Sequence, residues 1–436
     1  MGRMEGDALT PTSFRLATIT LELVERRGLS LEAAFREALR KVGRREEGAL
    51  RLAREALRRF AEADLLLRAH GLAGIPLRRR CAFRVAYAAL AAGAWPVESI
   101  RALGGGLLSG RLRALLSRRG LEEARELASR LPPEERLAVE NSFPPWLVKR
   151  LVRRLGLREA ERLVKACARR VLWVRVNTLK ARRGEVLSRL RRYATVREDR
   201  DFPELVELVG LDELPPELLK MMERGLIVPQ DKGSVAVVHA LEPRGELLVL
   251  DAAAAPGVKT SLIQQLSSNA AEVVAVDVSG RRVKAMASLL SRLGVRGVHI
   301  VWGDSRLMAY SRRYDRVLLD APCTNTGAIA SDPSLRLSLW REPRVRDYVA
   351  LQAALLENSL KHLKRGGLLV YSTCSLLEEE GEEVVEPWLS LSYSLSPEGV
   401  IGEPGYRGFR CSSHVRRLYP HRHRTTGFFI ARFTQE

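Results

Sequence analysis

An α/β fold with a doubly wound sheet is predicted for the second half of this chain, and two observations predict it. From Val228 onward, short apolar segments typical of strands alternate with amphipathic segments typical of helices. Repeated βα units of this kind indicate a sheet with helices on both faces. Before that point the alternation is missing, since residues 1–140 have a helical pattern throughout. We therefore predict an all-helical domain (1–140), a helical linker with a small α+β subdomain (141–228) and the α/β domain (229–436).

The charge of the chain favours a polyanionic partner. Its 436 residues contain 72 Lys and Arg against 52 Asp and Glu, which gives a net charge of +20. An excess of this size is typical of proteins that bind nucleic acid, because contacts with phosphates release counterions. A biased genome composition or a heat-stable surface would give the same excess, so the charge alone leaves these alternatives open.

The sequence predicts neither a membrane protein nor a metal site. The N-terminus lacks an apolar signal core, and no apolar run approaches the ~20 residues of a membrane span. The cysteines are odd in number and scattered, without CxxC or Cys/His spacing, which argues against a disulfide scaffold or bound zinc. We expect a cytoplasmic protein with five free thiols, namely Cys81, Cys167, Cys323, Cys374 and Cys411.

Apolar residues recur at helical spacing in the N-terminal region, as at Leu16, Ile19 and Leu23. Two basic clusters lie in this region, Arg78–Arg80 and a looser set of Arg111, Arg113, Arg118 and Arg119. Basic clusters usually form solvated helix faces, but they also suit contact with RNA phosphates. Both interpretations stay open.

The small α+β subdomain is predicted from its β-branched and aromatic content, with strands at 171–179 and 205–209 and a helix at 184–193. Arg175 and Asn177 lie on the first of these strands. They are either cleft residues or surface residues of the strand, and the sequence does not decide between the two.

The elements of the α/β domain follow from the same patterns. Strands are expected at 246–251, 272–277, 298–302, 315–320, 368–372 and 427–433, and helices at 259–266, 281–293 and 347–363. Gly366 and Gly367 should form a turn just before the strand at 368–372.

Acidic residues at three successive strand ends indicate a nucleoside-bearing cofactor. Asp251 and Asp277 end the first two strands of the α/β domain, and Asp304 follows the third. In open α/β sheets ligands bind beyond the carboxyl ends of the strands, where an acid suits the hydroxyls of a ribose. The small residues after Asp251 would let a ligand lie against the backbone. The alternative is three solvated aspartates in loops.

Two further strand ends carry groups suited to chemistry on a pyrimidine. One strand ends in Asp320 with Cys323 close behind, and another runs into Cys374. A thiolate that adds to carbon 6 of cytosine makes carbon 5 nucleophilic, and an acid near ring nitrogen 3 assists. Lys259 could favour the thiolates or orient the acid. A lone cysteine is more often a packing residue, and we expect this of Cys81, Cys167 and Cys411.

A set of motifs runs from about Trp146 to the C-terminus: Gln230-Asp231, Asp251, Pro256-Gly257, Lys259-Thr260, Asp277, Gly303-Asp304, Asp320-Ala321-Pro322-Cys323, Tyr371-Ser372-Thr373-Cys374-Ser375 and Gly427-Phe428-Phe429. In these motifs the chain resembles the RsmB/NSUN family of S-adenosylmethionine-dependent RNA cytosine-5 methyltransferases. This resemblance implies a Rossmann-like methyltransferase domain, S-adenosylmethionine as methyl donor and structured RNA (rRNA or tRNA) as substrate. The helical N-terminal region resembles a NusB-like RNA-binding domain. We expect a monomer.

The resemblance also implies roles for individual residues. Cys374 would be the nucleophile, Cys323 the cysteine that assists release, Asp320 the group on the base and Lys259 an active-site lysine. The donor would be held by Ala253, Ala254, Ala255, Pro256, Gly257, Lys259, Asp277, Arg282, Asp304 and Asp320. Two alternatives remain: DNA cytosine methyltransferases use the cysteine after proline, which would make Cys323 the nucleophile, and a non-catalytic RNA-binding ribosome assembly factor would keep the fold.

Three positions depart from the family pattern. Ala253 stands where cysteine is common, Val258 where a glycine is common, and Asn325 lies in a loop that often reads Ser-Gly. The branched Val258 should narrow the donor loop. Asn325 is a milder change, because asparagine tolerates left-handed backbone geometry.

Overall fold

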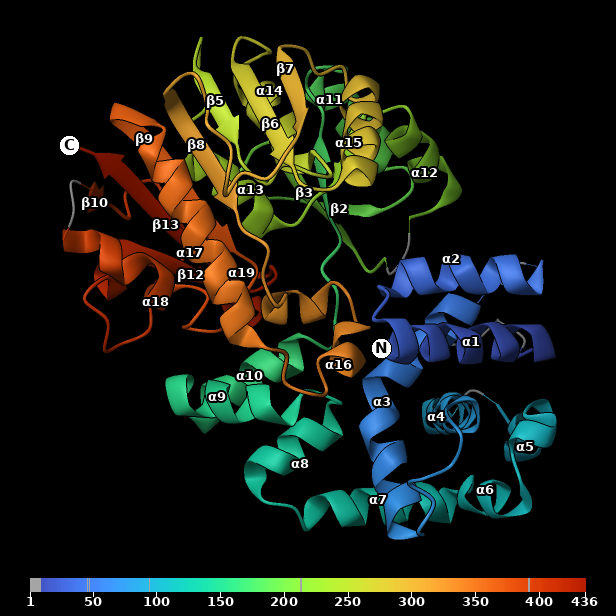
Figure 1. Cartoon of the computed structure of the whole chain (residues 1–436). Coiled ribbons are helices and arrows are strands. Elements are labelled where there is room, and N and C mark those ends of the chain that lie inside the picture. Colours follow the sequence, from blue (N-terminus) through green and yellow to red (C-terminus); the bar gives the residue numbers. More distant parts are fainter. Residues whose placement is uncertain (1–8, 45, 47, 94, 212–213, 391–392) are drawn as a thin grey trace. The chain divides into compact units, whose positions relative to one another are not determined.

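The computed structural model describes residues 9–436 except 45, 47, 94, 212–213 and 391–392. The chain divides into two compact units (Figure 1). The helical unit comprises Met1–Ala168 and Ile329–Pro343, and the sheet unit comprises Arg169–Ala328 and Arg344–Glu436. The predicted domain boundaries at 140 and 228 stay predictions.

Helices make up the helical unit, as the sequence predicts. They are α1 (Pro11–Arg27), α2 (Leu31–Val42), α3 (Ala49–Ala69), α4 (Leu77–Ala92), α5 (Val97–Leu103), a 3₁₀ turn (Gly105–Leu107), α6 (Gly110–Leu115), α7 (Arg118–Ser129), α8 (Pro133–Glu140), α9 (Pro145–Leu155) and α10 (Leu157–Ala166). The predicted apolar stripe of Leu16, Ile19 and Leu23 is buried. Ser30 accepts a hydrogen bond from the amide of Ala33, which caps α2.

The segment 329–343 joins the helical unit although it follows β8 of the sheet unit in sequence. It contains α16 (Leu335–Ser338). The guanidinium of Arg336 is buried and donates to the carbonyl oxygens of Asn141 and Cys167. Trp340 packs edge-to-face on Phe60, with ring centroids 4.9 Å apart. The segment therefore completes the core of the helical unit, which sequence patterns did not predict.

The small subdomain of the sheet unit is a four-stranded antiparallel sheet with the order β2-β3-β1-β4. Its elements are β1 (Trp173–Val176), α11 (Arg183–Leu190), β2 (Thr195–Glu198), β3 (Leu205–Val209), α12 (Pro216–Glu223) and β4 (Ile227–Pro229). The predicted strands around β1 and β3 and the helix α11 are confirmed.

Neither interpretation of Arg175 and Asn177 is correct, because both side chains are buried inside the sheet unit. Arg175 donates to Gln230 (2.7 Å), to Ser261 (2.6 Å) and to Gln265. Asn177 donates to the carbonyl oxygens of Gly225 and Leu293. Both residues thus connect the small subdomain to helical segments of the α/β domain that follows it.

The main sheet has the strand order β11-β12-β13-β9-β8-β5-β6-β7, with β10 also paired to β13. The strands are β5 (Leu248–Asp251), β6 (Glu272–Asp277), β7 (Val298–Trp302), β8 (Tyr314–Asp320), β9 (Leu363–Thr373), β10 (Tyr393–Leu395), β11 (Glu403–Pro404), β12 (Val415–Leu418) and β13 (Phe428–Gln435). Strands β5 to β9 are parallel, as predicted, whereas β10 to β13 pair antiparallel.

Helices cover both faces of this sheet. They are α13 (Lys232–Ala240), α14 (Val258–Leu266), α15 (Gly280–Arg292) and α17 (Val345–Lys361), followed by the short α18 (Glu382–Val385) and α19 (Pro420–His423). Leu250, Leu319 and Tyr371 pack with α17, while the alternate residues of the same strands pack with α13 and α14. Figure 1 shows α17 lying along β8 and β9.

The chain crosses from one side of the sheet to the other next to β5. From β5 it proceeds to β6 and β7, and it then returns to β8 and β9 on the opposite side. The gap between β5 and β8 is therefore the topological switch point, where open α/β sheets bind their ligands.

The prediction of a turn at Gly366 and Gly367 is wrong, because β9 runs through both residues. They form an irregularity in the ladder: Tyr314 pairs with Leu363, but Arg316 pairs with Leu368. Gly366 has a φ of +67°, which glycine adopts without steric cost. The extra residues of β9 bulge out at this point, and pairing then resumes up to Ser372.

Candidate active site

A cavity of about 510 Å³ lies at the carboxyl ends of β5 to β9. It is lined by the ends of these strands and by one face of α17: Ala252, Ala253, Ala255, Asp277, Val278, Arg282, Gly303, Asp304, Ser305, Arg306, Asp320, Ala321, Pro322, Cys323, Asn325, Leu351, Leu355 and Cys374. The strand ends that the sequence singled out therefore meet in one cavity at the switch point of the sheet.

The loop after β5 requires small residues. Gly257 has a φ of +95°, and a Cβ atom there would lie 2.8 Å from Cγ of Met286. Ala254 is tied to β6 through its amide, which donates to the carbonyl of Val276 at 2.8 Å. Of the predicted donor-loop residues, Ala253 and Ala255 line the cavity. Ala254 and Gly257 are buried beneath it, and Pro256 is exposed.

Asp277 holds the donor loop as well as lining the cavity. One carboxylate oxygen accepts from the amide of Ala255 (3.2 Å) and the other from the amide of Ser279 (3.0 Å). Arg282 lies 3.3 Å from the same carboxylate and also donates to the carbonyl of Ala255. The predicted residues Asp277, Ala255 and Arg282 therefore form one hydrogen-bonded group.

Asp304 lines the same cavity, but its carboxylate is engaged by a neighbour. It accepts from the amide and from Nε of Arg306, each at 3.0 Å. The hydrogen bond from the Arg306 side chain lowers the pKa of Asp304. The acid stays ionised, as recognition of a polar ligand edge requires.

Asp251 differs from the other two strand-end acids, because it is 1% exposed and supports the loop from below. Thr260 donates to it at 2.6 Å. Burial raises the pKa of Asp251 to about 7. The expectation that all three acids face the ligand is therefore wrong for Asp251.

Lys259, Asp320 and Ser372 form a line of polar contacts at the ends of α14, β8 and β9. Nζ of Lys259 donates to one oxygen of Asp320 at 2.6 Å, and the hydroxyl of Ser372 donates to the other at 2.7 Å. Burial lowers the pKa of Lys259, but the Asp320 carboxylate outweighs it and the pKa is raised. A protonated lysine thus faces Asp320, which lines the cavity.

The two cysteines lie side by side, with their sulfur atoms 3.2 Å apart. Cys323 is 6% exposed, whereas Cys374 is more accessible. The hydrogen bond with Cys374, together with burial, raises the pKa of Cys323 well above its usual range. Cys323 is therefore held as a thiol next to its more exposed neighbour.

Asn325 contacts both cysteines, a role the sequence analysis missed. Its Oδ1 atom lies 2.9 Å from Sγ of Cys374, and its Nδ2 atom donates to the carbonyl of Cys323 at 3.2 Å. Its φ of +60° lies in the left-handed region, which asparagine tolerates, as predicted. Asn325 lies on the cavity wall.

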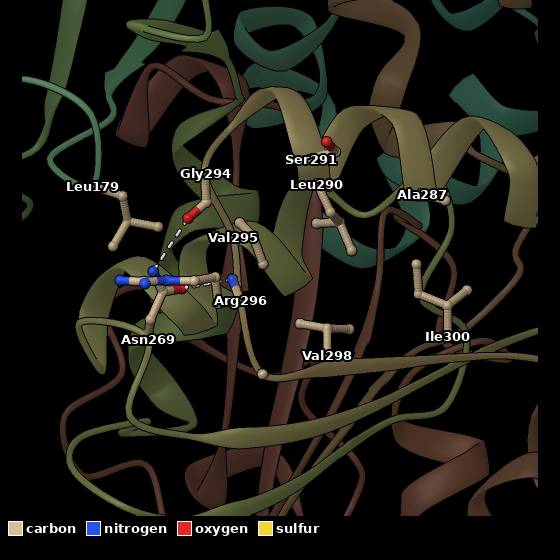
Figure 2. Close-up of a pocket in the computed structure, with 11 residues that line it drawn as sticks. Leu179, Asn269, Ala287, Leu290, Ser291, Gly294, Val295, Arg296, Val298 and Ile300 are labelled. Carbon is tan, nitrogen blue, oxygen red and sulfur yellow. Dashed lines mark hydrogen bonds between the residues drawn. The ribbon is translucent and has the colours of Figure 1, made fainter.

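A second cavity, of about 540 Å³, lies at the amino ends of β6 and β7 (Figure 2). Its walls are mostly aliphatic, with Leu290, Val298 and Ile300 on one side (Figure 2). Asn269 bonds to Gly294 and Arg296 across its rim. Because this cavity is at the opposite ends of the strands from the acids and thiols, we do not assign the site to it.

The basic clusters of the helical unit are partly engaged in its own structure. Arg80 pairs with Glu25 at 2.6 Å. Arg79 and Arg113 donate to carbonyl oxygens of the Gly105–Gly106 turn. Other members of the clusters have exposed side chains, namely Arg78, Arg111, Arg118 and Arg119.

Across the described residues, no helix is long and apolar enough to span a membrane. In the same part of the chain no group of three or more His, Cys, Asp or Glu side chains is arranged as a metal site. The predicted packing cysteines Cys81, Cys167 and Cys411 are buried, as expected.

Two family models match the chain. Residues 238–434 match the 16S rRNA methyltransferase RsmB/F family, and residues 143–209 match the ferredoxin-like domain of RsmF/B-like methyltransferases. Both matches lie outside residues 1–140, so they do not test the predicted NusB-like domain.

Named relatives agree with this family. A Bacillus subtilis protein, the probable ribosomal RNA small subunit methyltransferase B, is 32% identical over 68% of this chain and 67% of its own length. A tRNA (cytosine(72)-C(5))-methyltransferase of Pyrococcus horikoshii is 39% identical over 49% of this chain, and the match spans 54% of that enzyme. The chain thus spans about half the length of one of these relatives and two thirds of the other.

Solved structures extend the similarity. The crystal structure of PH0851 has a TM-score of 0.79 at 26% identity and covers 98% of this chain and 99% of its own. The structure of NSun6 from Pyrococcus horikoshii with SFG, an S-adenosylmethionine analogue, has a TM-score of 0.60 at 28% identity over 67% of this chain and 98% of its own. The Rossmann-like methyltransferase fold is confirmed. The chain belongs to the RsmB/F family of S-adenosylmethionine-dependent RNA cytosine-C5 methyltransferases.

Proposed function

We propose that this protein transfers a methyl group from S-adenosylmethionine to carbon 5 of a cytosine in structured RNA, either rRNA or tRNA. The observation that carries the proposal is the pair of sulfur atoms 3.2 Å apart, on loops after adjacent parallel strands, at the wall of a cavity. A reaction in which both thiols act on the same cytosine ring requires the two sulfur atoms to lie this close together.

The donor half of the cavity suits S-adenosylmethionine. The small residues Ala253 and Ala255 leave room against the backbone, and Gly257 allows the tight turn beneath them. Asp277 and Asp304 supply carboxylates for ribose and adenine. When bound there, S-adenosylmethionine supplies an electrophilic methyl group. Arg282 and the Lys259–Asp320 pair would support this site from two sides.

The reacting half suits a covalent mechanism with Cys374 as nucleophile. The Cys374 thiolate adds to carbon 6 of cytosine, and the electron pair moves through the ring so that carbon 5 can take the methyl group. Ring nitrogen 3 gains electron density in this step, and the proton that it takes up comes through Asp320 from protonated Lys259, whose Nζ lies 2.6 Å from the Asp320 carboxylate. Exclusion of water by a bound base would strengthen this contact.

Cys323 then acts as the base. Once Cys374 is bound to carbon 6 it no longer shares a hydrogen with Cys323, and the largest cause of the raised pKa of Cys323 is removed. With that cause gone, Cys323 can give up its thiol proton to solvent, and the resulting thiolate accepts the proton of carbon 5. The electron pair of that C–H bond restores the double bond between carbons 5 and 6, and the bond between Cys374 and carbon 6 breaks to leave Cys374 as a thiolate. The burial and raised pKa of Cys323 weigh against the reversed assignment, in which it attacks first.

For residues 1–140 we propose a NusB-like RNA-binding domain that is followed by the domains 141–228 and 229–436. The exposed side chains of Arg78, Arg111, Arg118 and Arg119 suit phosphate contacts. A monomer in the reducing cytoplasm would keep both active-site thiols free. The alternative of a non-catalytic assembly factor has no support in the names of the relatives.

The test is methyl transfer from labelled donor to unmodified total RNA. We expect Cys374→Ala to abolish transfer and Cys323→Ala to accumulate a covalent protein–RNA adduct, because the base that completes release is missing. Cys81→Ala, in the core of the helical unit, is the control for cysteine removal. Loss of transfer without adduct in Cys323→Ala, with an adduct in Cys374→Ala, would reverse the roles. No transfer by wild type to any RNA would refute the proposed activity.

A further inference from the structure

We infer that Glu380 is a positioning residue that fastens together the two loops carrying Cys323 and Cys374, so that both sulfur atoms can act on one base. This inference rests on the proposed function for its catalytic meaning. The part that concerns the structure is only the distance between the two sulfur atoms, and it does not depend on the reaction. Glu380 lies beyond β9, six positions after Cys374, and it does not line the cavity.

The carboxylate of Glu380 is fully buried and bonds to both loops. One oxygen accepts from the amide of Thr324 (2.9 Å) and from the amide group of Gln352 (3.1 Å). The other accepts from the hydroxyls of Thr324 (2.5 Å) and Ser375 (2.6 Å). Thr324 directly follows Cys323, and Ser375 directly follows Cys374. One side chain therefore holds the residue next to each sulfur.

The backbone of Glu380 is anchored to β9, which keeps the carboxylate in place. Its carbonyl oxygen accepts from the hydroxyl of Tyr371 at 2.9 Å and from the hydroxyl of Thr373 at 3.2 Å. The two cysteine loops are also joined directly: Gly327 donates its amide to the carbonyl of Cys374, and Thr326 bonds to Ser375 and to the amide of Leu376. Asn325 adds its contact with Cys374. Glu380 contributes a separate support, from a residue outside both cysteine motifs.

The donors that reach the Glu380 carboxylate in the described structure are neutral groups. A buried carboxylate without a cationic partner is costly, and it is tolerated where its hydrogen bonds are complete. A glutamine of the same size would present an NH₂ group where the carboxylate only accepts, and it would face donors from Thr324 or Ser375. The network therefore selects a carboxylate over a neutral residue of equal volume.

We call the hydrogen bonds that join Glu380 to Thr324 and Ser375 the clamp. Loss of this clamp should slow the release of the methylated base from Cys374 more than it slows the addition of Cys374 to carbon 6. Cys374 can still add to carbon 6 when its neighbour shifts, but Cys323 must reach the proton on the adjacent carbon of the same ring. Reactions of this kind are sensitive to misplacement of a reacting group by about 1 Å. Displacement of the Cys323 loop would thus leave the RNA attached to Cys374.

The experiment compares wild type with Glu380→Gln in two assays. The first needs neither RNA nor donor: oxidation of the two thiols by diamide, with the Cys323–Cys374 disulfide followed by mass spectrometry. Because the sulfur atoms start 3.2 Å apart, we expect Glu380→Gln to slow this reaction roughly tenfold or more, as the effective concentration of one thiol at the other falls. The second assay measures methyl transfer and the fraction of protein trapped on RNA.

In the second assay we expect kcat to fall roughly a hundredfold, KM for the donor to stay within about threefold, and the trapped fraction to rise. Glu386→Gln is the matched control, because this carboxylate accepts from the amides of Arg410 and Cys411 in another loop. Should Glu380→Gln fail to fold, Thr324→Val removes one hydroxyl of the network and Thr324→Ser restores it. Thr324→Val should slow oxidation and Thr324→Ser should not.

The outcomes separate the inference from the proposed function. Slower disulfide formation in Glu380→Gln supports the clamp even if wild type methylates no RNA, in which case the proposed function alone fails. An unchanged rate of disulfide formation in folded Glu380→Gln overturns the clamp, whatever the methylation assay gives. Thr324→Val that oxidises as fast as wild type overturns it equally.

Discussion

Single residues of the cavity illustrate what a motif can and cannot indicate. Asp320, Cys323 and Cys374 could be singled out because strand ends in an open sheet converge and these residue types carry the chemistry. Ser372 and Asn325 could not be found as contacts of the same groups, because each meets its partner from a segment far away in the sequence. Glu380 was hidden in a run of glutamates that resembles a solvated turn, although its side chain is fully buried.

The pKa of Asp251 leads to a prediction about stability and pH. In the unfolded chain its pKa is 3.8, and in the folded protein burial raises it to about 7. Between these values the folded state keeps a proton that the unfolded state has lost. The contribution of Asp251 to the free energy of unfolding is therefore fully present below pH 4. It should fall by about 1.4 kcal/mol per pH unit as the pH rises to 7.

Urea unfolding at pH 5, 6 and 7 tests this expectation. Asp251→Asn should remove that part of the pH dependence, because the amide does not titrate. Asp304→Asn serves as a control, since the pKa of Asp304 is lowered by Arg306 and this acid is ionised throughout the range. If the free energy of unfolding changes with pH in the same way for wild type and Asp251→Asn, then Asp251 does not hold the proton.

At the scale of elements, strands and helices with strong patterns were predictable and irregular ones were not. The strands β6 and β7 were predicted with the bounds that the structure has. β2 is largely exposed, with the sequence TVRE, and lacks the apolar content that marks a strand. The glycine pair in β9 looks like a turn, because the partner strand that accommodates the bulge lies far away in the sequence.

The turn that joins β5 to α14 gives a second prediction. Gly257→Ala should destabilise the protein by about 1–2 kcal/mol for the left-handed backbone, and by about 1–3 kcal/mol more for the contact with Met286. Since this turn shapes the donor loop, affinity for S-adenosylmethionine should fall roughly tenfold or more. Urea unfolding and calorimetric titration with the donor measure the two effects.

Gly245 offers the matched control. Its φ is +78°, but a Cβ atom there would meet nothing within 4 Å. Gly245→Ala should therefore show the backbone cost alone and bind the donor as wild type does. Equal stability losses in the two variants would mean that Met286 moves away without cost.

For the molecule as a whole, the division of the chain was the least predictable feature. The proline pairs before α8 and α9 begin helices, so they do not mark which parts of the chain pack together. The contribution of residues 329–343 to the helical unit depends on contacts between residues far apart in sequence, such as Arg336 with Asn141. Local periodicity holds no information about such contacts.

Arg336 should consequently determine the stability of the helical unit. Arg336→Leu leaves the carbonyl oxygens of Asn141 and Cys167 without this donor, which should cost about 2–4 kcal/mol. Arg346→Leu is the control, because Arg346 is exposed and pairs with Glu383 at 3.0 Å, an interaction worth below about 1 kcal/mol. Thermal unfolding followed by circular dichroism should show an earlier transition for Arg336→Leu only. If both variants unfold at the same temperature, the buried guanidinium has no stabilising role.

The place of residues 329–343 in the chain also affects how the protein is made. A ribosome synthesises α1 to α10 first, then the small subdomain and β5 to β8, and only afterwards the segment that supplies Arg336 and Trp340 to the helical core. A chain is synthesised at about 5–20 residues per second, and its domains usually fold as they emerge. Here the first unit to emerge must wait with an incomplete core until most of the second has been translated. Its apolar surface is exposed during that interval, when a nascent chain most depends on chaperones.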